Sequence, residues 1–176
     1  MEPKWSRQGL REYLEMYYHP VHPVQYREEP MMMAREAACL PKATPAARKG
    51  LAAPRGLRKW LEKTDAGFTE TLLKRIDQTG KKDAEIYTRA NLSRQHFSKI
   101  RNNPDYRPTK ATALALAIAL ELDLEQTRDL IGRAGYALTK SSKFDLIVMY
   151  FIEQGHYDLQ DINEALYEYD QSLLGM

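Results

Sequence analysis

The sequence predicts an all-α fold, and two observations lead to this prediction. From residue 57 onward the apolar residues recur at helical spacing, and no segment there alternates strictly between apolar and polar residues as a half-buried strand does. In the same part of the chain, start and stop residues bound each periodic run. We therefore divide the chain into an N-terminal extension, residues 1–56, and a helical domain, residues 57–176.

The N-terminal extension is predicted to hold two short helices and a linker. An amphipathic helix is expected over residues 5–18, and the prolines that follow His19 end it because proline lacks the backbone N–H. A second short helix is expected to begin at Met31. Residues 41–56 are rich in alanine, proline and basic residues without apolar periodicity, which is typical of a linker.

Five short helices are predicted to follow, most of them with a capping residue at the start. Their ranges are 70–78, 84–90, 94–102, 110–122 and a last helix that ends near residue 134. The expected N-caps of the last four are Asp83, Ser93, Thr109 and Asp123. Gly80, Pro104 and Gly135 are expected to end helices, and Asn91 is expected to take a left-handed backbone in the turn before Ser93.

Two further helices are predicted to form a C-terminal hairpin. The first, over residues 143–154 behind the cap Ser142, is apolar on almost every face and must therefore be buried. The second follows the cap Asp158 and has its apolar face at Leu159, Ile162 and Leu166. We expect the hairpin to pack on the five-helix bundle or on a second copy. The nearly all-apolar first helix also predicts that the chain forms a homodimer.

The charged residues are unevenly distributed, although the net charge is only +2. Residues 1–73 hold 12 basic and 9 acidic side chains, residues 74–110 hold 10 and 4, and residues 111–176 hold 4 and 11. A basic middle beside an acidic tail favours an anionic partner, such as a nucleic acid, for one face of the protein.

Residues 83–102 have the spacing of a helix-turn-helix unit. Phe97 and Ile100 are expected to point inward with Leu92, which leaves the polar side chains of residues 94–102 facing outward on a helix that fits the major groove. The side chains expected to read bases are Arg94, Gln95, Ser98, Lys99, Arg101 and Asn102. The residues expected to contact phosphates are Lys81, Lys82, Ser93, Arg107 and Lys110.

Residues 68–134 resemble the phage-repressor-like family. The matching features are Ile86 and Ala90, Leu92-Ser93-Arg94 over the turn, Phe97 and Ile100, Pro108-Thr109, and the run Ala-Leu-Ala-Ile-Ala-Leu. This resemblance implies a repressor-like five-helix bundle whose third helix reads duplex DNA. Tyr87 and Asn91 depart from the family pattern, which has alanine and glycine there. The tyrosine implies either a wider helix crossing or a ring that turns outward.

Residues 98–176 also resemble a bacterial C-terminal module that is appended to macro-domain and von Willebrand factor A-like proteins. The matching segments include Asp105-Tyr-Arg-Pro, Arg133-Ala-Gly-Tyr-Ala-Leu and Asp170-Gln-Ser-Leu-Leu-Gly.

Taken together, the helix-turn-helix spacing and the basic middle of the chain lead us to expect a DNA-binding helix-turn-helix protein that regulates transcription. The alternative is a protein-docking module of a bacterial signalling or defence system that does not bind DNA.

The sequence offers little support for catalysis, cofactors or membranes. The single cysteine, Cys39, cannot form an internal disulfide, and no residue is spaced to complete a metal site with His19 and His22. No glycine-rich loop follows a strand. The strongly apolar stretch 113–120 is far shorter than the roughly 20 residues that cross a bilayer, and no secretory signal opens the chain. We expect a cytoplasmic protein without enzymatic activity, metal or cofactor.

Overall fold

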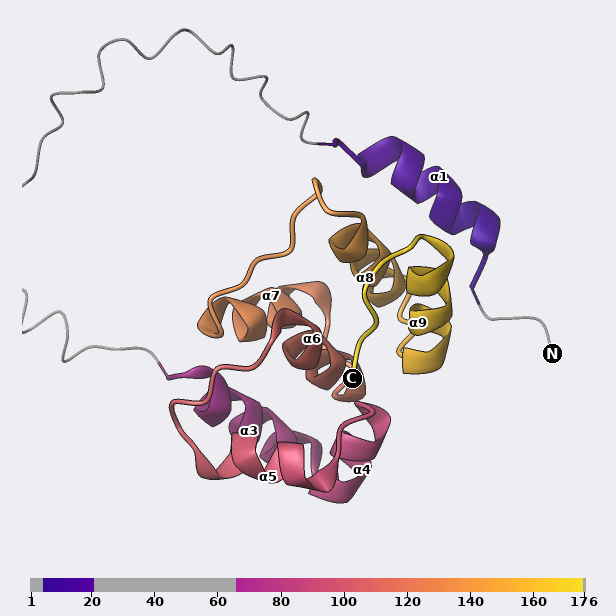
Figure 1. Cartoon of the computed structure of the whole chain (residues 1–176). Coiled ribbons are helices and arrows are strands. Elements are labelled where there is room, and N and C mark those ends of the chain that lie inside the picture. Colours follow the sequence, from indigo (N-terminus) through magenta and orange to yellow (C-terminus); the bar gives the residue numbers. More distant parts are fainter. Residues whose placement is uncertain (1–4, 21–65, 176) are drawn as a thin grey trace, which may run out of the picture. The chain divides into compact units, whose positions relative to one another are not determined.

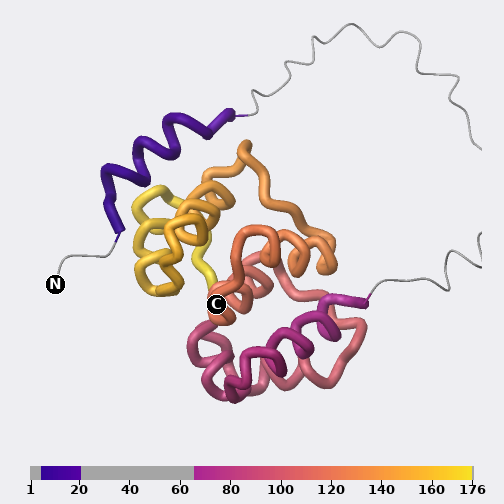
Figure 2. The backbone as a smooth tube through the Cα atoms, turned by 180° about the vertical axis from the view of Figure 1, so that it is seen from behind, coloured from indigo at the N-terminus to yellow at the C-terminus, as the bar shows by residue number. Residues whose placement is uncertain are grey.

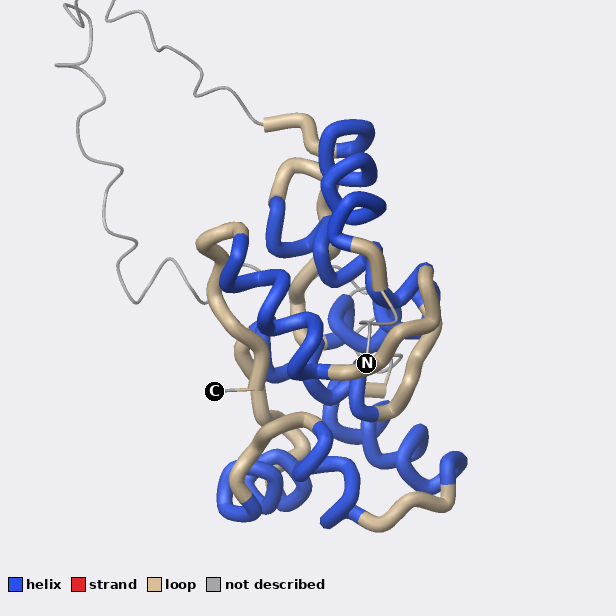
Figure 3. Tube along the Cα trace, turned by 90° about the vertical axis from the view of Figure 1, so that its right-hand side faces the viewer, coloured by secondary structure: helices blue, strands red, loops and turns tan. Residues whose placement is uncertain are grey.

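The computed structural model describes residues 5–20 and 66–175, which belong to one compact unit. Within these residues every regular element is a helix and no strand occurs, which confirms the predicted all-α fold for this part of the chain (Figure 3). The helix predicted from Met31, the linker 41–56, His22 and Cys39 lie outside the described residues.

Eight helices follow one another along the described residues (Figure 1). They are α1 (Arg7–Tyr17), α3 (Phe68–Thr79), α4 (Asp83–Arg89), α5 (Arg94–Asn102), α6 (Lys110–Ala119), α7 (Leu124–Arg133), α8 (Lys143–Glu153) and α9 (Leu159–Glu168). Five predicted caps are confirmed, because each accepts a hydrogen bond from a backbone N–H in the first turn: Ser93, Thr109, Asp123, Ser142 and Asp158.

Several helix ends differ from the prediction, three of them as follows. The first residue of α3 is Phe68 and not Glu70, because Gly67 takes the N-cap position. Asp83 is the first residue of α4 and not its cap, which is Lys82. Helix α6 ends three residues early, because Glu121 takes a left-handed backbone with φ 56° and reverses the chain. The predicted left-handed backbone of Asn91 is confirmed by its φ of 52°.

Helix α6 lies at the centre of the packing, and its residues 112–119 are all buried. Its alternating alanines and large aliphatic residues let α4, α7 and α9 approach it closely. Helix α3 packs against α5 and α7, and α4 packs against both α5 and α6. Helix α5 is thus held by α3 and α4, with Phe97 and Ile100 as its buried residues.

Helix α8 is covered by α1, α7 and α9. The Trp5 ring meets Phe151 edge to face at 5.1 Å between centroids, and Leu10 and Leu14 of α1 are buried. The division at residue 56 thus separated α1 from the helices with which it packs. The apolar faces of α8, on which the homodimer was expected, are covered within the chain. No helix among the described residues has the length and apolar character of a membrane span.

Candidate nucleic-acid interface

Helix α5 divides sharply into a buried side and an exposed side. Phe97 is only 3 % exposed and Ile100 is fully buried, while Leu92 is buried just before the helix. Ser93 fixes the start of the helix, because its Oγ accepts a hydrogen bond from the His96 N–H at 3.1 Å. The exposed side holds all six residues that were expected to read bases, namely Arg94, Gln95, Ser98, Lys99, Arg101 and Asn102.

These six side chains are not equally available to a ligand. The guanidinium of Arg101 forms an ion pair with Asp83 of α4, and Asn102 Nδ2 donates to Ser98 Oγ at 3.1 Å. Within the described residues, the side chains of the other three have neither a hydrogen bond nor an ion pair: Arg94, Gln95 and Lys99. We call these three residues the α5 face.

The expected phosphate contacts also divide into two groups. Lys81 Nζ lies 3.1 Å from Glu121 Oε1, and Lys110 Nζ lies 2.5 Å from Asp145 Oδ1, so both lysines have acidic partners that the sequence analysis missed. Lys82 and Arg107 are exposed and have no such partner in the part of the chain that the structure describes. Ser93 is exposed and serves as the α5 cap.

Half of the basic side chains in the segment 74–110 are paired inside the protein. Of the 10 basic residues in the segment 74–110, five form ion pairs: Arg75, Lys81, Arg89, Arg101 and Lys110. Four of these five pair with acids of residues 111–176, so the acidic tail neutralises basic side chains of α3, α4 and α6 rather than those of the α5 face.

Glu121 is the acid that holds two of these basic residues. Arg89 Nη1 lies 2.6 Å and Lys81 Nζ 3.1 Å from its Oε1. Hydrogen bonds from Arg89, and then from Lys81, keep the pKa of Glu121 below its ordinary value. The carboxylate thereby ties α4 and the turn before it to the end of α6.

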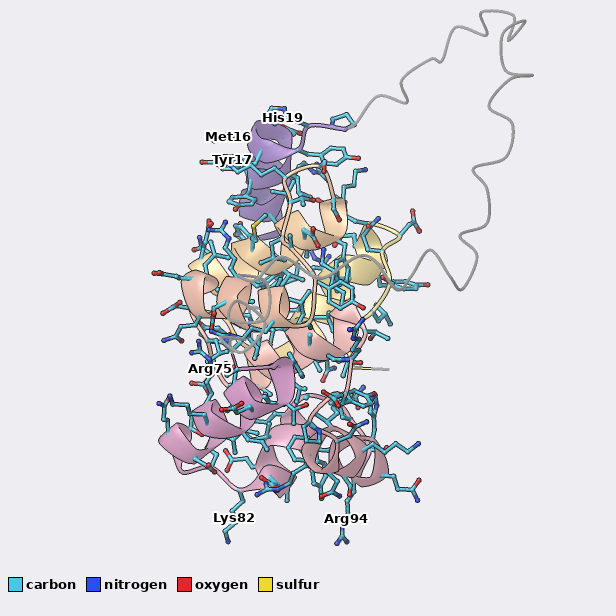
Figure 4. All side chains as sticks on the ribbon, turned by 90° about the vertical axis from the view of Figure 1, so that its left-hand side faces the viewer. Met16, Tyr17, His19, Arg75, Lys82 and Arg94 are labelled. Carbon is cyan, nitrogen blue, oxygen red and sulfur yellow. The ribbon has the colours of Figure 1, made fainter. Side chains whose placement is uncertain are left out.

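Two of the exposed basic side chains near α5 lie at one end of the described helices. Figure 4 shows Lys82 and Arg94 extending away from the ribbon in the same direction, while Met16 and Tyr17 of α1 lie at the opposite end. A shallow hollow of about 410 Å³ borders α5 beside this end, lined by Ser98, Lys99, Asn102, Asn103 and Tyr106. A long anionic ligand can therefore approach α5 without meeting α1.

Tyr87 and His96 both turn toward the protein. The half-buried Tyr87 ring lies 5.9 Å from the Phe97 ring, which favours neither a solvent-facing ring nor an open gap at the crossing. The Tyr87 carbonyl still accepts a hydrogen bond from the Leu92 N–H at 2.8 Å, so the turn closes. His96 Nε2 lies 2.9 Å from the Tyr106 hydroxyl and is thus already bonded.

The described residues offer no alternative centre for metal chemistry, because no three of their His, Cys, Asp or Glu side chains are grouped to hold an ion. Comparison of the chain with protein-family models, with curated proteins and with solved structures found no match.

Proposed function

We propose that the chain is a DNA-binding helix-turn-helix protein that contacts duplex DNA through α5 and regulates transcription. The observation that carries the proposal is the α5 face: two cations and an amide, exposed and unpaired, on a helix whose other side is buried. Helices α3 to α7 supply five short helices with α5 third in order, which is the arrangement that the resemblance to phage-repressor-like proteins implies.

The residue types of the α5 face suit base recognition. Arginine can donate two hydrogen bonds to O6 and N7 of guanine, and glutamine can bond in the same way to adenine, with about 1–3 kcal/mol of discrimination for each good pair. An α-helix with its side chains is about 10–12 Å across and fits a major groove about 12 Å wide. Arg94 and Gln95 lie in the first turn, where repressor-like helices approach the bases.

The exposed Lys82 and Arg107 are proposed to contact the phosphates beside the groove. Such contacts fix the register of the protein without reading the sequence. Lys81 and Lys110 are less suited to this role than the sequence suggested, since binding to a phosphate would compete with Glu121 and Asp145. Because few phosphates are contacted, we expect the affinity for DNA to fall only moderately as the salt concentration rises.

The alternative proposal is a protein-docking module that does not bind DNA. It is supported by two large apolar side chains that are exposed in the described residues, Tyr167 of α9 at 77 % and Met16 of α1 at 66 %. Neither lies on α5, so changes to the α5 face distinguish the two proposals.

The first prediction concerns the triple variant Arg94→Ala, Gln95→Ala and Lys99→Ala. We expect its affinity for duplex DNA to fall at least about tenfold, and the slope of log affinity against log salt to flatten by about 0.9 for each phosphate that the variant no longer neutralises. Fluorescence anisotropy with a labelled duplex pool at several salt concentrations measures both quantities.

The matched control is Arg11→Ala, Lys140→Ala and Gln154→Ala, which removes the same side-chain types from exposed positions away from α5. It should bind duplex DNA like the wild type. If wild-type binding does not respond to salt, or if the α5 variant binds as well as the control, DNA binding through α5 is wrong and the docking alternative stands.

A further inference from the structure

The segment that follows α9 returns to the turn between α4 and α5. We call residues 171–175 the C-terminal strap. Figure 1 and Figure 2 both show the C-terminal end of the trace beside the end of α4. Leu174 and Gly175 of the strap are buried, so the segment is part of the packed structure.

Asn163 of α9 holds the strap through its backbone. The Leu174 N–H donates to Asn163 Oδ1 at 2.8 Å, and Asn163 Nδ2 donates to the Leu174 carbonyl at 3.1 Å. The first strap residue is fixed as well, because the Gln171 N–H donates to the Leu166 carbonyl at 2.8 Å. The strap is thus attached to α9 at both of its ends.

Gly175 approaches the α4–α5 turn so closely that a side chain would not fit. A Cβ at this position would lie 2.3 Å from the Ala90 carbonyl oxygen and 3.0 Å from the Asn91 Cβ. Both of these atoms belong to residues of the turn, and one of them is backbone. Glycine is therefore required here by contact as well as by its positive φ of 72°.

The residues that Gly175 touches determine how α5 leaves the turn. Ala90 is fully buried, and Asn91 supplies the left-handed backbone that reverses the chain. Inside the turn the Asn91 N–H donates to the Thr88 carbonyl at 3.0 Å, and the Leu92 N–H donates to the Tyr87 carbonyl at 2.8 Å. Leu92 leads directly into Ser93, the cap of α5.

We propose that the C-terminal strap positions the α4–α5 turn, and through it the α5 face, with Asn163, Leu174 and Gly175 as the positioning residues. The strap is expected to restrain the turn even when no DNA is bound. The further claim, that this restraint affects DNA binding, rests on the proposed function. The C-terminal hairpin thus supports the reading helix across the molecule, although it supplies no residue of the α5 face.

Amide hydrogen exchange of the full chain, followed by NMR, tests the restraint. In Gly175→Ala we expect the Asn91 and Leu92 amides to exchange at least about tenfold faster than in the wild type, while the Leu130 amide of α7 is unchanged. Gly155→Ala is the matched control, because Gly155 has a similar φ of 65° but no atom within 4 Å of the added Cβ.

Asn163→Leu is a second variant, which removes both hydrogen bonds to Leu174 and keeps the branching of the side chain, with methyl groups in place of the amide oxygen and nitrogen. It should accelerate exchange at the same two amides. If Gly175→Ala does not fold, exchange in Asn163→Leu decides by itself whether the strap restrains the turn. Exchange at Asn91 and Leu92 that is the same in the strap variants as in Gly155→Ala would overturn the proposal.

A duplex-binding measurement separates this proposal from the proposed function. If the wild type binds duplex DNA, the strap variants should bind at least about threefold more weakly with an unchanged salt slope, because they retain every cation. Accelerated exchange with unchanged DNA affinity would overturn the link from the turn to the α5 face. If the wild type does not bind duplex DNA, the proposed function fails, whereas the exchange result still decides whether the strap restrains the turn.

Discussion

Lys110 illustrates how burial of its partner changes the role of a charged side chain. Its Nζ lies 2.5 Å from Oδ1 of Asp145, whose side chain is only 1 % exposed. The other oxygen of Asp145 accepts hydrogen bonds from the N–H and hydroxyl of Thr139, at 2.9 and 3.2 Å. A carboxylate that is removed from water needs such partners, so the main role of Lys110 is to join α6 to α8.

The second prediction is that Lys110→Met lowers the free energy of unfolding by about 2–4 kcal/mol, because it leaves the buried carboxylate without its cation. Urea titration followed by circular dichroism measures this change. Lys82→Met is the control, since Lys82 is exposed and unpaired in the described residues, and it should change the stability by less than about 0.5 kcal/mol. Equal stability of the two variants would contradict a structural role for Lys110.

At the scale of single residues, the sequence was most informative where the chemistry is local. Ser93 and Asn91 are recognisable because a cap and a left-handed turn depend on their own side chains and nearest neighbours. The partner of Lys110 lies in another helix, and no residue near Lys110 in the sequence indicates which acid that partner is. The exposed α5 face was therefore predictable, whereas the internal pairing of Lys81 and Lys110 was not.

Individual helices are joined by charges as well as by apolar packing. Glu121, at the end of α6, accepts hydrogen bonds that fix α4 and the α3–α4 turn, with a partner as far as 40 residues away in the sequence. Because these bonds lower its pKa in the folded state, Glu121 stabilises the protein above its ordinary pKa. This stabilisation is lost as the pH falls through the folded-state pKa.

The third prediction follows from this pH dependence. The wild type should be more stable than Glu121→Gln near pH 7. The difference should shrink as the pH falls below the ordinary pKa of glutamate, about 4, and vanish once the pH is below the lowered folded-state pKa, where the wild-type carboxylate is protonated as well. Because Glu121 is 45 % exposed, we expect the difference to be small. Urea titrations between about pH 3 and about pH 7 measure it.

Glu125→Gln is the control for this series, because Glu125 is exposed in the first turn of α7 and has no side-chain partner among the described residues. A difference between the wild type and Glu121→Gln that persists unchanged at about pH 3 would contradict the ion-pair explanation. It would indicate that the glutamine changes the packing or the left-handed backbone at this position instead.

For the molecule as a whole, the docking of α1 connects the two ends of the described chain. Trp5 packs on Phe151, and the Tyr150 hydroxyl donates to the Ser6 carbonyl at 3.4 Å. Arg7 adds an exposed ion pair with Glu164 of α9 at 2.7 Å. Most of the stabilisation should come from the buried ring, since exposed pairs contribute little.

The fourth prediction is that Trp5→Ala lowers the free energy of unfolding by about 3 kcal/mol, because it removes the apolar ring and leaves a cavity beside Phe151. Met16→Ala removes an exposed apolar side chain from α1, the helix that follows Trp5, and should change the stability by less than about 0.5 kcal/mol. Urea titration compares the two. A protein that tolerates both substitutions equally would show that α1 adds nothing to the stability of the unit.

The pattern of apolar residues predicted that α1 and α8 are helices with faces to bury, but it did not say which surfaces cover them. An amphipathic period specifies a face and not its partner. The sequence therefore left open whether the nearly all-apolar helix at 143–154 meets the bundle or a second copy, and it did not indicate α1, whose Ser6 cap lies 144 residues before Tyr150.

This long connection has a consequence for synthesis on the ribosome. Helix α1 is translated long before the surface of α8 that shields Trp5, Leu10 and Leu14. At roughly 5–20 residues per second, the nascent chain carries an uncovered apolar helix for on the order of ten seconds. During that interval these side chains are available to chaperones or to neighbouring nascent chains, and the two ends of the unit can meet only after α8 has left the ribosome.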